Sequence, residues 1–484
     1  MIRNGKKKAI SCALVAAMSV GLAACGTTSY DFKVSYDGIK TGDVSSKVSV
    51  HDPSILKADG EYYIFGSHMS AAKSSDLLNW EKVADGYSKK NPVYGQIYDV
   101  ADEAFAYSGS KNSLIKTDDK QVHVWAPDVI YNETTGLYYM YYCTTSTWNA
   151  SNLCYGTSTT PEGPYEWQGA LIYSGFNRKT ISGTDVLDYV DEDYAYKNYI
   201  KGAQYNYEDY PNAIDPTVFY DADGRMWMVY GSWSGGIFLL EIDKTTGLVI
   251  HPEADEANNV DPYYGKRLLG GGHISIEGPY IMYDEASGYY YLFVSYGALT
   301  SNGGYQVRVF RSKTVDGDYV DMNGKYPEKS AQHQNFGLKL TGNYKLPSLE
   351  KAYMATGHNS AFVDDDGRMY LVYHTRFNDN GEGHSPRVHQ MLVNEDGWPC
   401  ELPYQTQGET VNKDGYDADD IIGRYYVINQ GTAIDSKIAN PVILYLEKNG
   451  KVKGEKSEGT WECKDGSYYM NITIDGKKYS GVFC

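Results

Sequence analysis

A short unit recurs five times along this chain, and the repetition constrains the fold more than any other feature of the sequence. Each copy runs from a polar or small residue through apolar residues into a Gly-containing turn and then an aromatic run. The aromatic runs span residues 62–66, 138–142, 226–230, 289–294 and 369–373. An apolar stretch, a tight Gly turn and a second strand-forming stretch together indicate a β-hairpin. The intervals between copies leave room for a four-stranded sheet in each.

The composition agrees with an all-β fold. The 484 residues include 48 Tyr and 50 Gly, which favour many short strands joined by turns. Repeated four-stranded sheets arranged around one axis form a β-propeller. We therefore predict a five-bladed β-propeller over residues 45–405. A β-sandwich with chance similarity between the units is the alternative.

The repeat breaks near residue 400, and a polar segment at 408–420 indicates a linker. Strand-like runs follow at 423–428, 442–447, 459–463, 468–474 and 478–483, several of them joined by Asn-Gly or Asp-Gly turns. We predict a small C-terminal antiparallel β-domain over residues 415–484. Between the second and third units, the polar, Tyr-rich stretch 173–212 is interpreted as a long insertion over one face.

The N-terminus has the form of a secretory signal. Basic residues at 3 and 6–8 precede an apolar stretch at 10–20, and Leu22, Ala23, Ala24 and Cys25 follow. This end resembles the bacterial lipobox, in which the cysteine is lipid-modified. We predict a signal peptide over 1–24, lipidation at Cys25, a linker over 25–44 and an extracytoplasmic, membrane-anchored protein. An ordinary signal peptide with an incidental cysteine is the alternative.

Charge and cysteines narrow the possible partners. The formal net charge is -18, and no basic patch appears, so nucleic acid is disfavoured and a neutral polysaccharide is favoured over an acidic one. The seven cysteines show no CxxC or zinc spacing. Buried or free thiols are therefore the default expectation, and a pair facing across a hairpin is the alternative for Cys143 and Cys154, which flank residues 144–153 symmetrically.

Three of the five units open with an acidic residue: Asp52, Asp215 and Glu277. In a propeller, the innermost strands begin at one mouth of the central channel, so these carboxyl groups are expected to converge there. Glu277 is two residues before its proline, whereas each Asp is one before, and the longer side chain is expected to compensate. Carboxyl groups so placed supply the acid and the base of glycosidic hydrolysis without a cofactor. Alone, each Asp-Pro is also ordinary turn chemistry.

Several motifs resemble those of glycoside hydrolase family 43. The blade motifs are at 51–54, 125–128, 213–216 and 276–280, and motifs at 230–236, 303–305, 311–313 and 357–360 resemble the arabinanase branch. Runs at 387–390 and 394–399 resemble the two-domain endo-1,5-α-L-arabinanases. The resemblance covers residues 45–484.

The resemblance implies an inverting mechanism. Asp52 would be the general base that activates water, Glu277 the general acid, and Asp215 the residue that tunes and orients the acid. Inversion leaves room for a water molecule, so the carboxyl groups of Asp52 and Glu277 are expected to be roughly 6.5–9.5 Å apart.

The resemblance also implies an ion and sugar subsites. His358, which opens the fifth unit, would lie beside a channel Ca²⁺, and His374 is a further candidate ligand; a histidine bonded to water or carboxylate is the alternative. The expected substrate-binding residues are Asn212, Ala213, Ile214, Ser232, Trp233 and Ser234. Trp125 would stack on an arabinose ring or serve in packing.

The expected activity is hydrolysis of internal α-1,5 linkages in arabinan. An exo-acting α-L-arabinofuranosidase or β-xylosidase on the same fold is the nearest alternative, because the 173–211 insertion is placed to wall off or extend the cleft. A surface glycan-binding lipoprotein without catalysis and a scaffold for protein partners are the alternatives from other classes.

Overall fold

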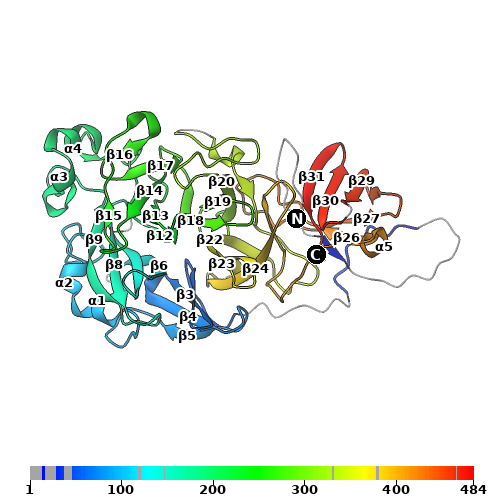
Figure 1. Ribbon diagram of the computed structural model, residues 1–484, viewed down its shortest axis with the longest axis horizontal. Helices are drawn as coiled ribbons and strands as arrows, with labels where there is room; N and C mark the ends of the chain where they lie inside the picture. The colour runs from blue at the N-terminus through cyan, green and yellow to red at the C-terminus, as the bar shows by residue number, and fades with distance from the viewer. Residues whose placement is uncertain are drawn as a thin grey trace.

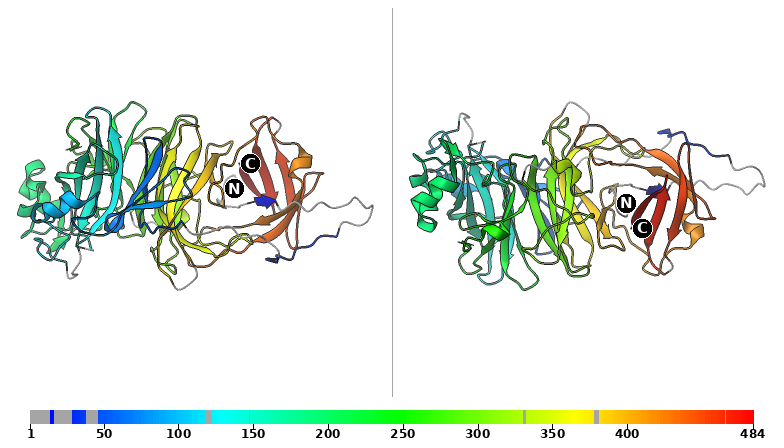
Figure 2. Two further views of the ribbon diagram at one scale, coloured as in Figure 1. Left: turned by 90° about the horizontal axis from the view of Figure 1, so that it is seen from below. Right: turned by 90° about the horizontal axis from the view of Figure 1, so that it is seen from above.

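The computed structural model describes residues 14–16, 29–37, 46–117, 122–146, 148–329, 332–377, 381–464 and 466–484. Five sheets form one body, and a sixth, larger sheet lies at one end of the long axis of the molecule (Figure 1). Views from below and above show the same separation between the two parts (Figure 2).

Each of the five sheets is one blade, built from strands that pair antiparallel in chain order, except for local strands in the third. The blades are β2 (Ser54–Ala58), β3 (Glu61–Gly66), β4 (Ser70–Ser74) and β5 (Glu81–Ala84); β6 (Val124–Asn132), β7 (Leu137–Thr145), β8 (Ser151–Ser158) and β9 (Glu166–Tyr173); β12 (Thr217–Tyr220), β13 (Met226–Tyr230), β14 (Ile237–Ile242), β15 (Val249–Ile250), β16 (Val260–Asp261) and β17 (Gly265–Leu269); β18 (Ile276–Asp284), β19 (Tyr289–Tyr296), β20 (Gln306–Ser312) and β21 (Leu338–Lys339); and β22 (Tyr353–Val363), β23 (Met369–Phe377), β24 (Ser385–Val393) and β25 (Pro399–Glu401).

The first strands of the blades form a closed ring. β2 contacts β6, β6 contacts β12, β12 contacts β18, β18 contacts β22, and β22 contacts β2. Buried tyrosines and aliphatic residues fill the spaces between neighbouring blades, as with Tyr141 and Tyr230 between the second and third. The predicted five-bladed propeller is confirmed. Because the inner strands run the same way around the ring, their starts meet at one mouth of the channel.

A left-handed residue lies two residues before β2 and β12 and inside β6, β18 and β22, at matching positions of the five units. Asp52, Ala126, Asp215, Gly278 and His358 have φ angles of 56°, 42°, 56°, 55° and 45°. We call these five the mouth positions. The register of β6, β18 and β22 shifts at the same place, which is the signature of a β-bulge, a device that re-aims side chains beside active sites.

The mouth position of the fourth blade is therefore Gly278, and Glu277 precedes it. The sequence places Glu277 two residues before its proline, one residue off the positions of Asp52 and Asp215, and the structure has the same offset. Between the pairs Glu277 with Ser295 and Tyr280 with Phe293, β18 has two residues where β19 has one. The bulge, rather than side-chain length alone, thus sets where the Glu277 carboxyl points.

The C-terminal sheet contains seven antiparallel strands in the order β1-β26-β27-β28-β29-β30-β31. They are β1 (Leu14–Ala16), β26 (Gly423–Val427), β27 (Val442–Leu446), β28 (Lys451–Gly454), β29 (Glu458–Cys463), β30 (Tyr469–Ile474) and β31 (Lys477–Val482). Five match the predicted runs. β28 was missed because its Lys-Val-Lys-Gly sequence buries one apolar side chain, Val452, too little for an alternating signal.

Of the segment 1–28, the structure describes only β1, which pairs with β26. The predicted lipidation site, Cys25, and the rest of the predicted signal peptide lie outside the described residues. Among the described helices, none is long and apolar enough to cross a membrane.

Short helices lie mainly in the connections and in the insertion. They are η1 (Ser67–Met69), α1 (Gly95–Asp99), α2 (Ala101–Ala104), η2 (Ile181–Gly183), α3 (Val186–Tyr189), α4 (Glu192–Asn198), η3 (Glu256–Asn258), η4 (His333–Asn335) and α5 (Ala418–Ile421). The insertion carries η2, α3, α4 and the hairpin β10 (Ile200–Lys201) and β11 (Gln204–Tyr205). α3 and α4 lie at the end of the molecule opposite the C-terminal sheet (Figure 1).

The expectation of buried or free thiols is confirmed for the described cysteines, whereas the facing of Cys143 and Cys154 across the hairpin is wrong. Cys143 pairs with Leu153, and Cys154 pairs with Tyr142. A one-residue offset places two side chains on opposite faces of a sheet, and the two thiols accordingly belong to different core clusters. All five cysteines in the described residues are free.

Candidate active site

Asp52 lies at the mouth among imidazole rings. Its Oδ1 is 3.0 Å from His51 Nε2 and 3.0 Å from His358 Nδ1, and its Oδ2 accepts a hydrogen bond from Ser67 Oγ. Burial by itself raises the pKa of Asp52, but the neighbouring imidazoles of His358 and His51 outweigh it and hold the pKa well below its usual range. Asp52 is therefore ionised at neutral pH.

Glu277 lies among neutral donors instead. Tyr305 OH donates to Oε1 at 2.7 Å, and Trp233 Nε1 and Ser232 Oγ donate to Oε2 at 2.5 and 3.2 Å. Burial raises the pKa of Glu277, the Tyr305 hydrogen bond lowers it, and the charge of Asp52 raises it; the net pKa is above its usual value. This carboxyl group therefore holds its proton to a higher pH than an ordinary Glu.

Asp215 and His358 lie between Asp52 and Glu277: His358 contacts Asp52, and Asp215 contacts the residue that follows Glu277. The Gly278 N–H donates to Asp215 Oδ2 at 3.2 Å. Burial is the main cause that raises the pKa of Asp215 to about 7; His358 lowers it, while the charges of Glu277 and Asp52 add to the rise. Burial lowers the pKa of His358, but Asp52 and Asp215 outweigh it and raise it to about 9. Contacts connect all four groups, because His358 contacts Asp52 and packs against Gly278, which follows Glu277 and donates to Asp215.

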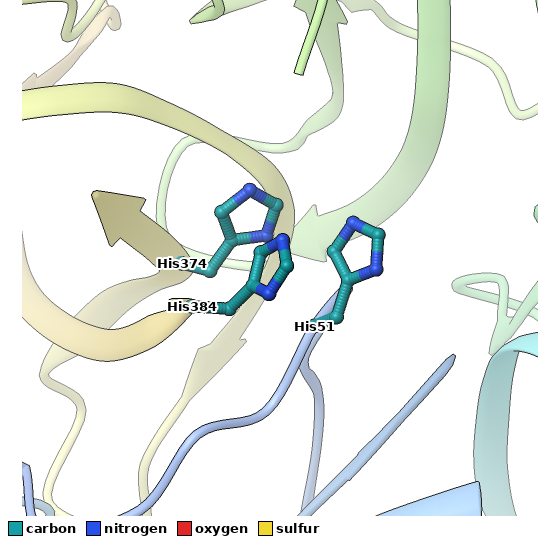
Figure 3. A group of neighbouring side chains, drawn as sticks. All are labelled: His51, His374 and His384. Carbon is teal, nitrogen blue, oxygen red and sulfur yellow. The ribbon is translucent and has the colours of Figure 1, made fainter. Parts of the chain in front are cut away.

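Three histidines besides His358 lie next to one another, as Figure 3 shows, and two of them, His51 and His374, contact Asp52. His51, His374 and His384 each offer a nitrogen within 4.8 Å of the others. Asp52 N–H donates to His374 Nδ1 at 3.4 Å, and Arg376 Nη2 is 2.7 Å from His384 Nε2, which therefore accepts. Burial lowers the pKa of His374 well below its usual value and that of His384 to about 3. His374 and His384 are therefore neutral at neutral pH, and the three-histidine group lacks the oxygen ligands that calcium prefers.

His358, the predicted ion ligand, is not part of that group. The ring atom Nδ1 of His358 faces Asp52, and the backbone N–H of His358 donates to Ser295 Oγ at 2.8 Å. The imidazole ring packs against Gly278, where an added Cβ would be 3.3 Å from it. Nε2 is thus the one ring atom left for a ligand.

Of the predicted substrate-binding residues, two contact the carboxyl group of Glu277 and the others are engaged in packing or in internal hydrogen bonds. Ser232 and Trp233 contact Glu277 directly. Ala213 and Ile214 belong to the buried core between blades, and Ser234 is buried at 4% exposure. Asn212 uses its amide internally: Oδ1 accepts from Ser151 Oγ at 2.8 Å, and Nδ2 donates to Trp148 O at 3.0 Å. Trp125 is half-buried and packs against the same core.

Three residues of the site had no assigned role in the sequence. Tyr305, in the Gly303-Gly304-Tyr305 motif, bonds the carboxyl group of Glu277. Ser67 contacts Asp52 and also accepts from the Ala126 N–H at 2.8 Å, which joins two blades. Ser295 orients His358. Only Tyr305 lay in a recognisable motif, because the other two are ordinary serines at strand ends.

A carboxyl group with a lowered pKa and a second with a raised pKa at the same mouth supply the base and the acid that hydrolysis of a glycosidic bond requires. The fold and the site thus define a carboxylate-dependent glycoside hydrolase on a five-bladed propeller.

Comparison with known proteins agrees with this class. The profile described as "Glycosyl hydrolases family 43" matches residues 44–208 and 191–399, and one described as "C-terminal lipocalin-like domain" matches 403–484. An extracellular endo-α-(1→5)-L-arabinanase 2 of Bacillus subtilis is 37% identical, over 91% of this chain and 88% of its own. The crystal structure of an endo-1,5-α-L-arabinanase from Thermotoga petrophila is 38% identical, with a TM-score of 0.76 over 92% of this chain and 93% of that one. A family 43 glycoside hydrolase structure from Bacillus licheniformis is also 38% identical, with a TM-score of 0.76 over 90% and 91%.

The chain belongs to glycosyl hydrolase family 43. The protein is therefore an enzyme, a glycoside hydrolase, and neither a non-catalytic glycan-binding lipoprotein nor a scaffold for protein partners.

Proposed function

We propose that this protein hydrolyses internal α-1,5-L-arabinofuranosidic linkages of arabinan with inversion at the anomeric carbon. The observation that carries the proposal is the opposite tuning of two carboxyl groups at one mouth: the pKa of Asp52 is held well below its usual value by His358 and His51, and burial raises that of Glu277. The similarity to arabinanases over most of the chain supports the substrate, and the net charge of -18 suits a neutral polysaccharide.

In the proposed mechanism, Asp52 accepts a proton from a water molecule as that water attacks the anomeric carbon. Glu277 donates its proton to the leaving oxygen on the other side of the bond. Trp233 and Tyr305 hold the Glu277 carboxyl group from both oxygens, so that the acid is oriented before substrate arrives. Asp215, bonded by the Gly278 N–H, adds negative charge near the acid and favours its protonated form.

Product analysis on linear arabinan, linear xylan and polygalacturonan tests the activity. A ladder of arabino-oligosaccharides indicates endo action, arabinose alone indicates exo action, and absence of arabinan hydrolysis overturns the proposal. NMR of the first product distinguishes inversion from retention through the anomer released.

We also propose a channel calcium ion at His358. The residues present admit it through a single nitrogen, Nε2, because Nδ1 faces Asp52; water would complete the shell. When bound, such an ion would add positive charge beside the base. Metal analysis after mild purification, together with melting temperature in chelator, tests this: no bound calcium and no change in melting temperature would contradict it.

Finally, we propose that the protein is extracytoplasmic and is anchored through a lipid on Cys25. The relatives named extracellular support the compartment. A diacyl lipid anchors firmly where one acyl chain does not. Metabolic labelling with a fatty acid, compared between the natural chain and Cys25→Ala, tests the anchor: label on both or on neither would contradict it.

A further inference from the structure

One tryptophan stands out on the surface near the site. Trp148, in the connection between β7 and β8, is 72% exposed, the largest value among the large apolar side chains of the described residues. A single exposed ring is ordinary on a protein surface, but a contiguous group of wholly or partly exposed aromatic rings marks a binding site, and Trp148 belongs to such a group.

The backbone that carries Trp148 is held from beneath. Asn212, which is 6% exposed, donates from Nδ2 to Trp148 O at 3.0 Å, and its Oδ1 accepts from Ser151 Oγ. A buried amide with both ends engaged fixes this position in a connection that would otherwise be free to move. The ring is thus presented at a defined place.

An aromatic row connects Trp148 to the general acid. The centroids of Trp148 and His273 are 6.1 Å apart, and those of His273 and Trp233 are 5.4 Å apart. Tyr207 meets His273 edge-on at 5.7 Å. Trp233 in turn donates its indole N–H to Glu277. We call Trp233, His273, Tyr207 and Trp148 the aromatic row.

The insertion completes the row. Tyr207 belongs to the insertion between the second and third blades, and its neighbour Glu208 accepts from the Gly272 N–H at 2.6 Å, next to His273. Gly235 N–H donates to Gly272 O at 3.0 Å, which joins the same segment to the Trp233 turn. The insertion is therefore fastened along the row.

The row lies on the side of the acid. It begins at Trp233, which contacts Glu277, whereas the neighbours of Asp52 are the histidines of the first and fifth blades. The general acid protonates the oxygen that leaves, so the sugar beyond the broken bond lies on this side.

We propose that Trp148 is a sugar-stacking platform for the leaving-group portion of a neutral arabinan chain. The proposal rests on the proposed function. The apolar face of a furanose ring would cover the exposed indole, while Asn212 holds the platform at its distance from Glu277. Endo action benefits, because an open row accepts a chain that continues past the cut.

Trp148→Ala tests the platform, with Tyr189→Ala as the matched control. Tyr189 is 50% exposed and packs on His251 at a centroid distance of 3.7 Å, but it lies in α3 at the outer end of the molecule (Figure 1). For arabinohexaose, Trp148→Ala is expected to raise KM about 5- to 10-fold, as loss of one aromatic contact of about 1 kcal/mol does, with kcat within about 2-fold. Trp148→Phe is expected to keep KM within about 3-fold, and Tyr189→Ala to leave it unchanged.

The side of binding is read from arabinohexaose labelled at its reducing end, which is the leaving-group end. In Trp148→Ala, the preferred cut is expected to move toward the reducing end, because less is gained from sugars over the row. An unchanged KM, an equal rise in Tyr189→Ala, or a move toward the non-reducing end each overturns the proposal. A natural enzyme that leaves arabinan intact overturns the proposed function itself, so the two failures are distinct.

Discussion

The two sides of the channel mouth shift the pKa of the same chemical group in opposite directions. Asp52 is surrounded by His51, His358 and the buried ring of His374, and its pKa is held low. Glu277 is half-buried, its partners are the neutral donors Tyr305, Trp233 and Ser232, and its pKa is raised.

The difference shows that burial alone does not assign an acid or a base. Burial raises the pKa of both carboxyl groups. Imidazole charge reverses the effect at Asp52, while neutral hydrogen bonds leave it in force at Glu277. The two roles therefore depend on which blades supply the neighbours.

The sharpest test of the comparison removes each group in turn. Asp52→Asn and Glu277→Gln are each expected to lower kcat on arabinan by about 10² to 10⁴-fold. On an aryl arabinofuranoside, whose leaving group needs no proton, Glu277→Gln is expected to recover most of its rate and Asp52→Asn none. Equal recovery in both variants would break the assignment of acid and base.

Loss of the Tyr305 hydroxyl comes next. Its hydrogen bond lowers the pKa of Glu277, so Tyr305→Phe raises that pKa further and moves the basic limb of the kcat/KM profile to higher pH. The expected fall in kcat is about 10-fold, because a bond to a carboxyl group contributes about 1.5–3 kcal/mol. Tyr373→Phe is the control, since Tyr373 OH bonds Glu401 at 3.0 Å in the outer part of the fifth blade. A basic limb that stays in place would contradict the role of Tyr305.

On the other side, His51→Gln tests the imidazole effect. His51 lowers the pKa of Asp52, so its removal raises that pKa and moves the acid limb of kcat/KM to higher pH. The rate at the optimum is expected to fall by less than about 10-fold. His251→Gln, at the outer end near α3, should leave the profile unchanged. Movement of the basic limb instead would mean that His51 acts on Glu277.

Ser232→Ala should have the smallest effect. Ser232 Oγ is 3.2 Å from Glu277 Oε2, an oxygen that also accepts from Trp233 at 2.5 Å. Because the shorter bond remains, kcat is expected to fall by less than about 3-fold, with both pH limbs in place. A loss of kcat as large as that of Tyr305→Phe would show that the hydrogen bonds to Oε2, rather than the one to Oε1, set the pKa and orientation of Glu277.

The sequence by itself determined the blades and the convergence of the acids. Hairpin signals are local: aromatic strand residues and Gly turns act over a few positions, so the second strands of all five units were predictable. Their repetition determined that Asp52, Asp215 and Glu277 meet at one mouth.

Only the tertiary structure decided what each acid does. The rings around Asp52 come from residues 51, 358, 374 and 384, and a pKa depends on such distant neighbours, which no local pattern reports. Two features of the strands depend on a shift of a single residue. One is the bulge beside Glu277, and the other is the register that places Cys143 and Cys154 on opposite faces. A shift of one residue reverses the face of a strand, and it is settled by packing between blades rather than by the sequence of any one of them.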